Sequence, residues 1–145
     1  MKFFSFERRW LLGIFETILP GETNDRLEIG ARDLPMAAFL DDFLAHAPWR
    51  MRAGLRVALW VVQFSPLFLL GRLSPFTRLS LEEGERCLTR LGENRSYLLR
   101  ELPLLLKMVA CMGFCGHPEV QRRIGIPLSE GEEAPAWAKT GARSR

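Results

Sequence analysis

Apolar residues recur at helical spacing along most of this chain. They stand three and four positions apart, which places them on one side of a helix. No segment shows the sustained alternation of apolar and polar residues that is typical of a strand. The pattern therefore predicts an all-α protein, a compact bundle of five main helices plus a short C-terminal helix. The predicted helices span residues 5–18, 35–47, 49–70, 80–91, 96–114 and 118–124.

Local signals support several of these boundaries. Ser5 can cap the first helix, which should end before Pro20. Ser80, followed three residues later by Glu83, forms the sequence of a capping box at the start of the fourth helix. His117 can cap the short helix that begins at Pro118. Residues 21–33 are polar and turn-rich, and they predict a loop.

The chain has the length of one domain, with 145 residues, and 48% of them are hydrophobic. We expect residues 1–127 to form this helical domain. Residues 128–145 are rich in Glu, Gly, Ala, Ser and Arg, with Trp137 as their one large apolar residue. They predict a flexible C-terminal tail, whose removal from residue 129 onwards should leave folding nearly unchanged.

The segment around the third helix combines positive charge with the most apolar run of the chain. No acidic residue occurs between Asp42 and Glu82. The run from Val57 to Leu70 would span about 21 Å as a helix, less than the roughly 30 Å of a bilayer core. Three interpretations remain open: a buried central helix, a helix facing a partner, or a helix embedded in a membrane or lying at its surface.

The arginines at the start of this helix favour an interface. Arg52 and Arg56 lie one turn apart, where like charges repel, and no acid lies nearby in the sequence to relieve them. We therefore expect carboxylates from elsewhere in the fold, from a partner, or lipid phosphates to meet them. The residues assigned to a partner interface are Arg50, Arg52, Arg56, Trp60 and Phe64.

Catalytic chemistry has little support in the sequence. Cys111 and Cys115 lie one helical turn apart and His117 follows, which could indicate a metal site or a redox pair. The favoured interpretation is that both cysteines are small core residues. The chain has no glycine-rich nucleotide loop and no convincing nucleophile with its base. We assign no catalytic, cofactor-binding or metal-binding residue, and we expect the isolated protein to be colourless.

Charge and cysteine content bear on the type of partner and on the cellular location of the protein. The net charge of +3 is too weak to indicate a nucleic-acid partner. The three cysteines do not suggest a disulfide framework, and Glu16 interrupts the apolar stretch of a possible secretion signal. These features predict a cytoplasmic protein, with periplasmic or membrane association possible through a partner.

Several stretches between residues 5 and 126, taken in order, resemble one known family. The first helix ends at Ile18-Leu19-Pro20, Leu79-Ser80 precedes a run of glutamates, and Leu106-Lys107 is followed by Gly113-Phe114. The closing stretch runs from His117-Pro118-Glu119-Val120 to Ile124-Gly125. This series resembles the small subunit (subunit 3) of gluconate 2-dehydrogenase-type enzymes. The same helical unit accompanies glucose–methanol–choline family flavin oxidoreductases.

The resemblance implies a function in a complex. It implies a non-catalytic helical accessory subunit that binds, stabilises or helps to assemble a larger FAD-dependent dehydrogenase. The FAD and the reacting groups would belong to that partner, and this chain would hold no cofactor. The alternative is a membrane-surface adaptor that uses the basic and apolar segment 50–70 for peripheral contact with lipid.

Overall fold

The computed structural model describes residues 3–21, 28–126 and 133–139, and this part of the chain is helical with no strand. The prediction of an all-α fold is confirmed. The α-helices are α1 (Ser5–Ile18), α2 (Met36–His46), α3 (Trp49–Leu69), α4 (Leu81–Gly92), α5 (Tyr97–Cys115), α6 (Pro118–Arg123) and α7 (Ala136–Lys139). Two short 3₁₀ helices, η1 (Ala31–Asp33) and η2 (Phe76–Arg78), lie in the connections.

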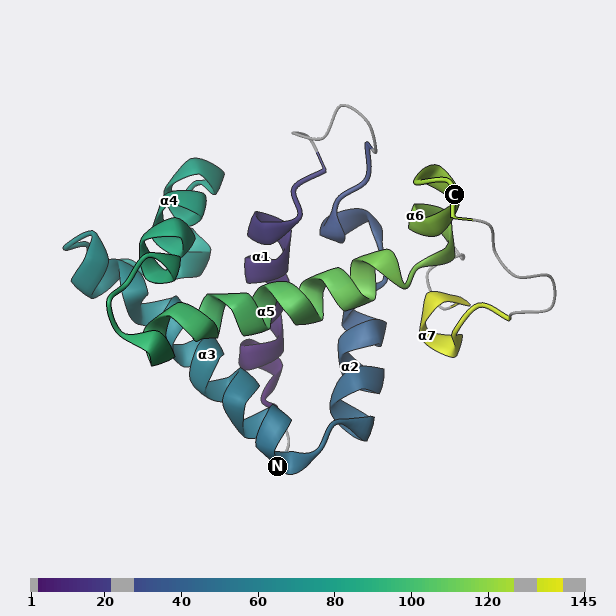
Figure 1. Cartoon of the computed structure of the whole chain (residues 1–145), viewed down its shortest axis with the longest axis horizontal. Coiled ribbons are helices and arrows are strands. Elements are labelled where there is room, and N and C mark those ends of the chain that lie inside the picture. Colours follow the sequence, from purple (N-terminus) through teal and green to yellow (C-terminus); the bar gives the residue numbers. More distant parts are fainter. Residues whose placement is uncertain (1–2, 22–27, 127–132, 140–145) are drawn as a thin grey trace.

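Helix α5 organises the molecule. It runs along the longest axis, with α1 and α3 packed against it and α6 and α7 near its C-terminal end (Figure 1). Helices α2 and α3 meet at a sharp corner formed by Ala47 and Pro48. The core lies where α1, α2, α3, α4 and α5 converge. Its largest fully buried apolar side chains are Phe15, Phe76, Leu11, Ile14, Leu40, Leu55, Leu59, Leu91 and Leu106.

The N-terminal caps predicted from the sequence are those found in the structure, with one exception. The predicted capping box of α4 is confirmed, because the Ser80 hydroxyl and the Glu83 carboxylate each accept a backbone N–H of the other residue at 3.3 Å. His117 caps α6 by accepting the N–H of Glu119 at 3.2 Å. Ser5, however, is the first residue inside α1, and the cap position belongs to Phe4. The Phe4 N–H donates to the Glu7 carboxylate at 2.8 Å.

Helix α3 is not buried on all sides. Its buried positions lie along one face, which packs mainly on α5. The opposite side exposes Val57, Trp60, Phe64, Leu67 and Phe68. The interpretation of α3 as a wholly buried central helix is therefore wrong, because the neighbouring helices cover only one side of it.

The C-terminal segment also departs from the prediction. Residues 136–139 form the short helix α7, which lies against α2. The Trp137 ring meets Phe39 of α2 edge-on, with ring centroids 5.1 Å apart, and lies 5.8 Å from the ring of His117. The prediction of a flexible tail is wrong for this part. The rest of the predicted tail, residues 128–132 and 140–145, lies outside the described residues, as do Met1 and Lys2 of the N-terminal segment.

Membrane insertion was one interpretation of the apolar run in α3. Within the described residues, no helix combines the length and the hydropathy that a bilayer crossing requires.

Candidate interaction surface

A buried carboxylate links α1 to α3. Glu7 of α1 is only 1% exposed although it is charged. Its Oε2 atom accepts hydrogen bonds from Nη2 of Arg56 at 2.7 Å and from the backbone of Phe4. Its Oε1 atom accepts from Nε1 of Trp60 at 3.0 Å. A buried carboxylate is stable only when its oxygens are satisfied in this way, so Glu7 fixes the positions of both α3 side chains.

The surroundings of Glu7 favour its charged form. Burial raises the pKa of this carboxyl, but three hydrogen bonds and the positive charge of Arg56 outweigh burial. The resulting pKa of Glu7 lies below its ordinary value of 4.5. The link between α1 and α3 is therefore a charged pair at neutral pH.

Aromatic rings gather next to this ion pair. The Trp60 ring contacts both Trp10 and Phe64, with ring centroids 5.5 and 5.6 Å away. Phe6 meets Trp10 edge-on at 5.0 Å and stacks on Phe4 at 5.6 Å. Such ring pairs add stability beyond the area that they bury. We call Phe4, Phe6, Trp10, Trp60 and Phe64 the aromatic face.

The aromatic face is exposed to solvent, and α3 extends it. Trp60 and Phe64 remain well exposed despite their contacts with other rings. The next turn of α3 adds Leu67 and Phe68, the latter 58% exposed. A continuous row of large apolar residues on the surface of a helix is typical of a surface that binds a partner.

The five residues assigned to an interface do not lie together in the structure. Trp60 and Phe64 lie together on the aromatic face. Arg50 is exposed near the α2–α3 corner, with its guanidinium 5.6 Å from the ring centre of Trp49. Arg52 is partly buried. Arg56 is mostly buried and pairs with Glu7, so of the three expected sources of an anion the one that meets it is a carboxylate from elsewhere in the fold.

The role of Glu7 was not predicted from the sequence. The residue stands four positions before Leu11 and seven before Ile14, so it shares the buried face of α1 with these two core residues. An acid in register with an apolar stripe is the signal that could have identified it. Its partners lie in α3, 49 and 53 residues further along the chain, so local patterns could not name them.

The cysteines of α5 occupy a different environment from the predicted one. Cys111 and Cys115 are both exposed, so their assignment to the core is wrong. The buried side of α5 carries Leu106, Val109 and Ala110, and the two cysteines lie on the other side. Cys87 is the buried cysteine, and its sulfur lies 3.0 Å from the Ser65 hydroxyl.

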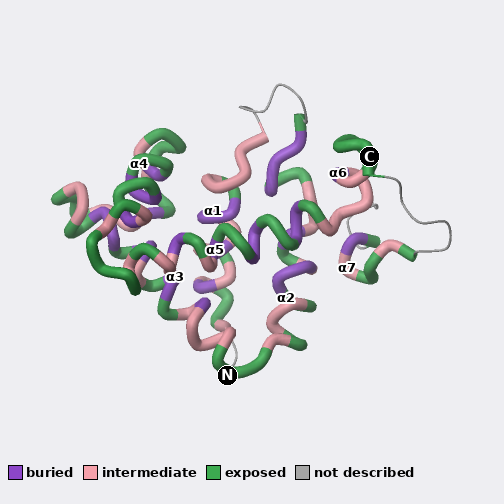
Figure 2. Tube along the Cα trace, in the orientation of Figure 1, coloured by how far each residue is buried: buried purple, intermediate pink, exposed green. Residues whose placement is uncertain are grey.

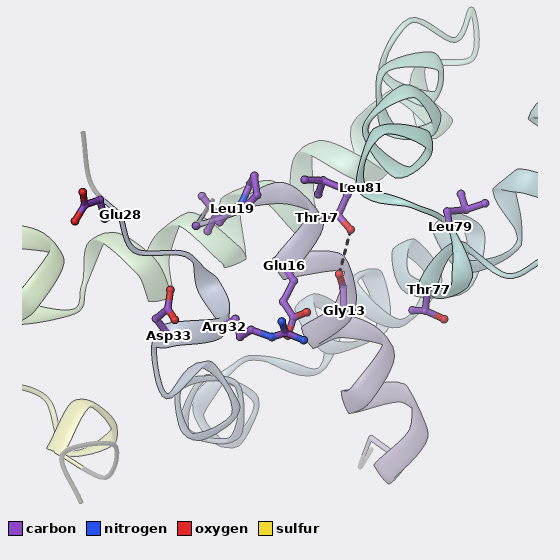
Figure 3. Close-up of a pocket in the computed structure, with 12 residues that line it drawn as sticks. Gly13, Glu16, Thr17, Leu19, Glu28, Arg32, Asp33, Thr77, Leu79 and Leu81 are labelled. Atoms are coloured by element: carbon purple, nitrogen blue, oxygen red, sulfur yellow. Dashed lines mark hydrogen bonds and ion pairs between the residues drawn. The ribbon is translucent and has the colours of Figure 1, made fainter. Parts of the chain in front are cut away.

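A hollow lies beside α1. It measures about 770 Å³ and lies between the end of α1, η1 and the segment that follows η2. Figure 3 shows Glu16 and Arg32 pointing toward one another across it, with 4.0 Å between Oε1 and Nε. Asp33 is engaged by the backbone N–H of Gly30 at 2.9 Å. These contacts give Glu16, Arg32 and Asp33 structural roles at the rim of the hollow.

Comparison with known proteins gives no family for this chain: no family model, no curated protein and no solved structure matches it.

Proposed function

We propose that this chain is a non-catalytic accessory subunit that docks on a larger protein through the aromatic face. The observation that carries the proposal is the exposed row Trp60, Phe64 and Phe68. Tryptophan is among the residues that most often dominate binding energy at protein interfaces. Glu7 and Trp10 hold Trp60 in place before binding, so less side-chain freedom is lost when a partner covers it.

The proposed partner is a FAD-dependent dehydrogenase of the glucose–methanol–choline type. This part of the proposal rests on the resemblance described for residues 5–126. The accessory chain acts by mass action: by binding only the folded large subunit, it adds RT ln(1 + [L]/Kd) to the stability of that subunit. The substrate pocket and the FAD belong to the partner.

The test is affinity purification of the tagged full chain from its native cells in mild detergent. We expect a large subunit to co-elute with the absorbance spectrum of flavin, while the chain purified alone is colourless. Flavin bound to the isolated chain in stoichiometric amount would contradict the accessory function. Recovery of a partner without flavin would show that the partner is not a FAD-dependent dehydrogenase. The docking surface would then be tested separately, by the variants described next.

Matched variants test the docking surface. Phe64→Asp and Phe68→Asp place a charge on the aromatic face and its extension, and we expect each to abolish co-elution. Leu73→Asp is the control, because Leu73 is 93% exposed and follows α3 in a loop. Circular dichroism checks that all three variants remain helical. Equal recovery of the partner by Phe64→Asp and by Leu73→Asp would place the interface elsewhere.

A membrane-surface adaptor is the second candidate function. One observation favours it: Trp49 and Arg50 are both exposed at the α2–α3 corner, and tryptophan beside arginine suits the boundary of an anionic membrane. This function predicts flotation of the chain with vesicles that contain anionic lipid, and loss of flotation in a Trp49→Ala, Arg50→Ala variant. Absence of flotation at low salt would rule it out.

A further inference from the structure

Four sulfur-containing side chains line the outer side of α5. They are Met108, Cys111, Met112 and Cys115, and we call them the sulfur face. Their spacing of three, four and seven residues places them on one side of the helix. Met108 is 52% and Met112 is 56% exposed, and both cysteines are exposed. Figure 2 shows the corresponding alternation of exposed and buried stretches along α5.

The two thiols of this face are close neighbours. Side chains four residues apart on a helix have Cβ atoms about 5 to 6 Å apart, which lets two sulfurs converge on one ion. Lys107 stands four residues before Cys111 on the same helix, so a positive charge lies about one turn from this thiol.

The kinds of ligand atom narrow the choice of metal. Among the described residues, no group of three or more His, Cys, Asp and Glu side chains could hold a metal ion. The part of the chain that the structure describes therefore forms no closed zinc site, which takes four ligands from these residue types. Two thiolates with two thioethers are instead a soft donor set, and such sets select Cu(I).

We propose that the sulfur face of α5 binds one Cu(I) ion through the thiolates of Cys111 and Cys115, with thioether contacts from Met108 and Met112. Binding replaces two S–H protons by two Cu–S bonds, so two protons leave for solvent. The copper remains Cu(I), and no electron is transferred. The bis-thiolate complex carries one negative charge, which the Lys107 ammonium offsets. This site is independent of the proposed docking function, because it involves none of the aromatic face.

The test is an anaerobic competition experiment with the reduced full chain. Cu(I) held by the coloured chelator bicinchoninate is titrated with protein, and the loss of colour reports the copper transferred. We expect one ion per chain and release of two protons per ion in weakly buffered solution. A ratio of one ion to two chains would contradict a site within a single helix, and no transfer at all would overturn the proposal.

Variants identify the ligands. Cys111→Ser and Cys115→Ser should each abolish transfer, while the double variant Met108→Leu, Met112→Leu should weaken binding by about tenfold, equivalent to about 1.4 kcal/mol. Cys87→Ala and Met51→Leu are the thiol and thioether controls outside the sulfur face, and both should bind like the wild type. Circular dichroism confirms folding. Copper transfer that survives in the Cys111→Ser, Cys115→Ser double variant would overturn the site.

Discussion

The aromatic face and the sulfur face are both exposed and apolar, but they are constructed differently. The rings of the aromatic face contact one another, and Trp60 is also held by a hydrogen bond to the buried Glu7. The sulfur face consists of separate side chains along one helix, and two of them are methionines with three rotatable bonds each. A rigid aromatic surface suits the fixed shape of a protein partner. A flexible set of soft sulfur atoms suits an ion, around which the side chains can rearrange.

Removing the buried acid Glu7 should have the largest effect on stability and on the order of the aromatic face. Glu7→Ala leaves Arg56 and Trp60 without their shared acceptor, and breaking a buried pair in this way costs about 3 to 5 kcal/mol. We expect a loss of this size in urea unfolding, together with a change in tryptophan emission. No change in the free energy of unfolding would show that Glu7 does not organise the aromatic face.

The buried side of α5 offers the next test. A methyl group at Gly113 would lie 2.5 Å from Cδ1 of Phe39, so Gly113→Ala should overfill the α2–α5 contact and destabilise the fold by about 1 to 3 kcal/mol. Gly92→Ala is the matched control, because nothing lies within 4 Å of its added methyl. Thermal unfolding should separate the two variants, and equal melting temperatures would refute the tight contact of α5 with α2.

A third test concerns α7. Trp137 is partly buried between Phe39 and His117, so Trp137→Ala should cost about 2 kcal/mol, roughly half the loss for a fully buried tryptophan. Truncation from residue 129 should lower stability by a similar amount. A truncated chain as stable as the full chain would instead agree with the original expectation of a dispensable tail.

The smallest expected effect is on pH dependence. Because the folded-state pKa of Glu7 is depressed, the stabilisation by its ion pair is complete above the ordinary carboxyl pKa and is lost as pH falls through the folded-state value. The stability difference between wild type and Glu7→Gln should therefore shrink as pH falls from ~6 to ~3. A difference that stays constant over this range would mean that the Glu7 charge contributes nothing.

The helices were predictable because their signals are local. Ser80 and Glu83 lie three residues apart, and the apolar stripe of α1 repeats within a few turns. The spacing of Cys111 and Cys115 likewise showed that they share a face of α5. It could not show which face the other helices cover, and the cysteines were assigned to the wrong one.

The candidate surfaces depend on contacts between distant parts of the chain. Arg56 was predicted to need an anion, but the anion is Glu7, 49 residues earlier. Trp137 appeared isolated in a polar segment, and only the folded chain brings it to Phe39. In both cases the sequence shows the type of residue, but only tertiary packing determines which partner it contacts.

The central claim is that the aromatic face, and not the sulfur face, is the surface that a protein partner covers. Hydroxyl-radical footprinting tests it directly, because aromatic rings and sulfur atoms both react and mass spectrometry locates the products. On comparing the free chain with the purified complex, we expect strong protection of Trp60, Phe64 and Phe68, and unchanged labelling of Met108 and Met112. Protection of the two methionines with unchanged labelling of the three aromatic residues would contradict the account.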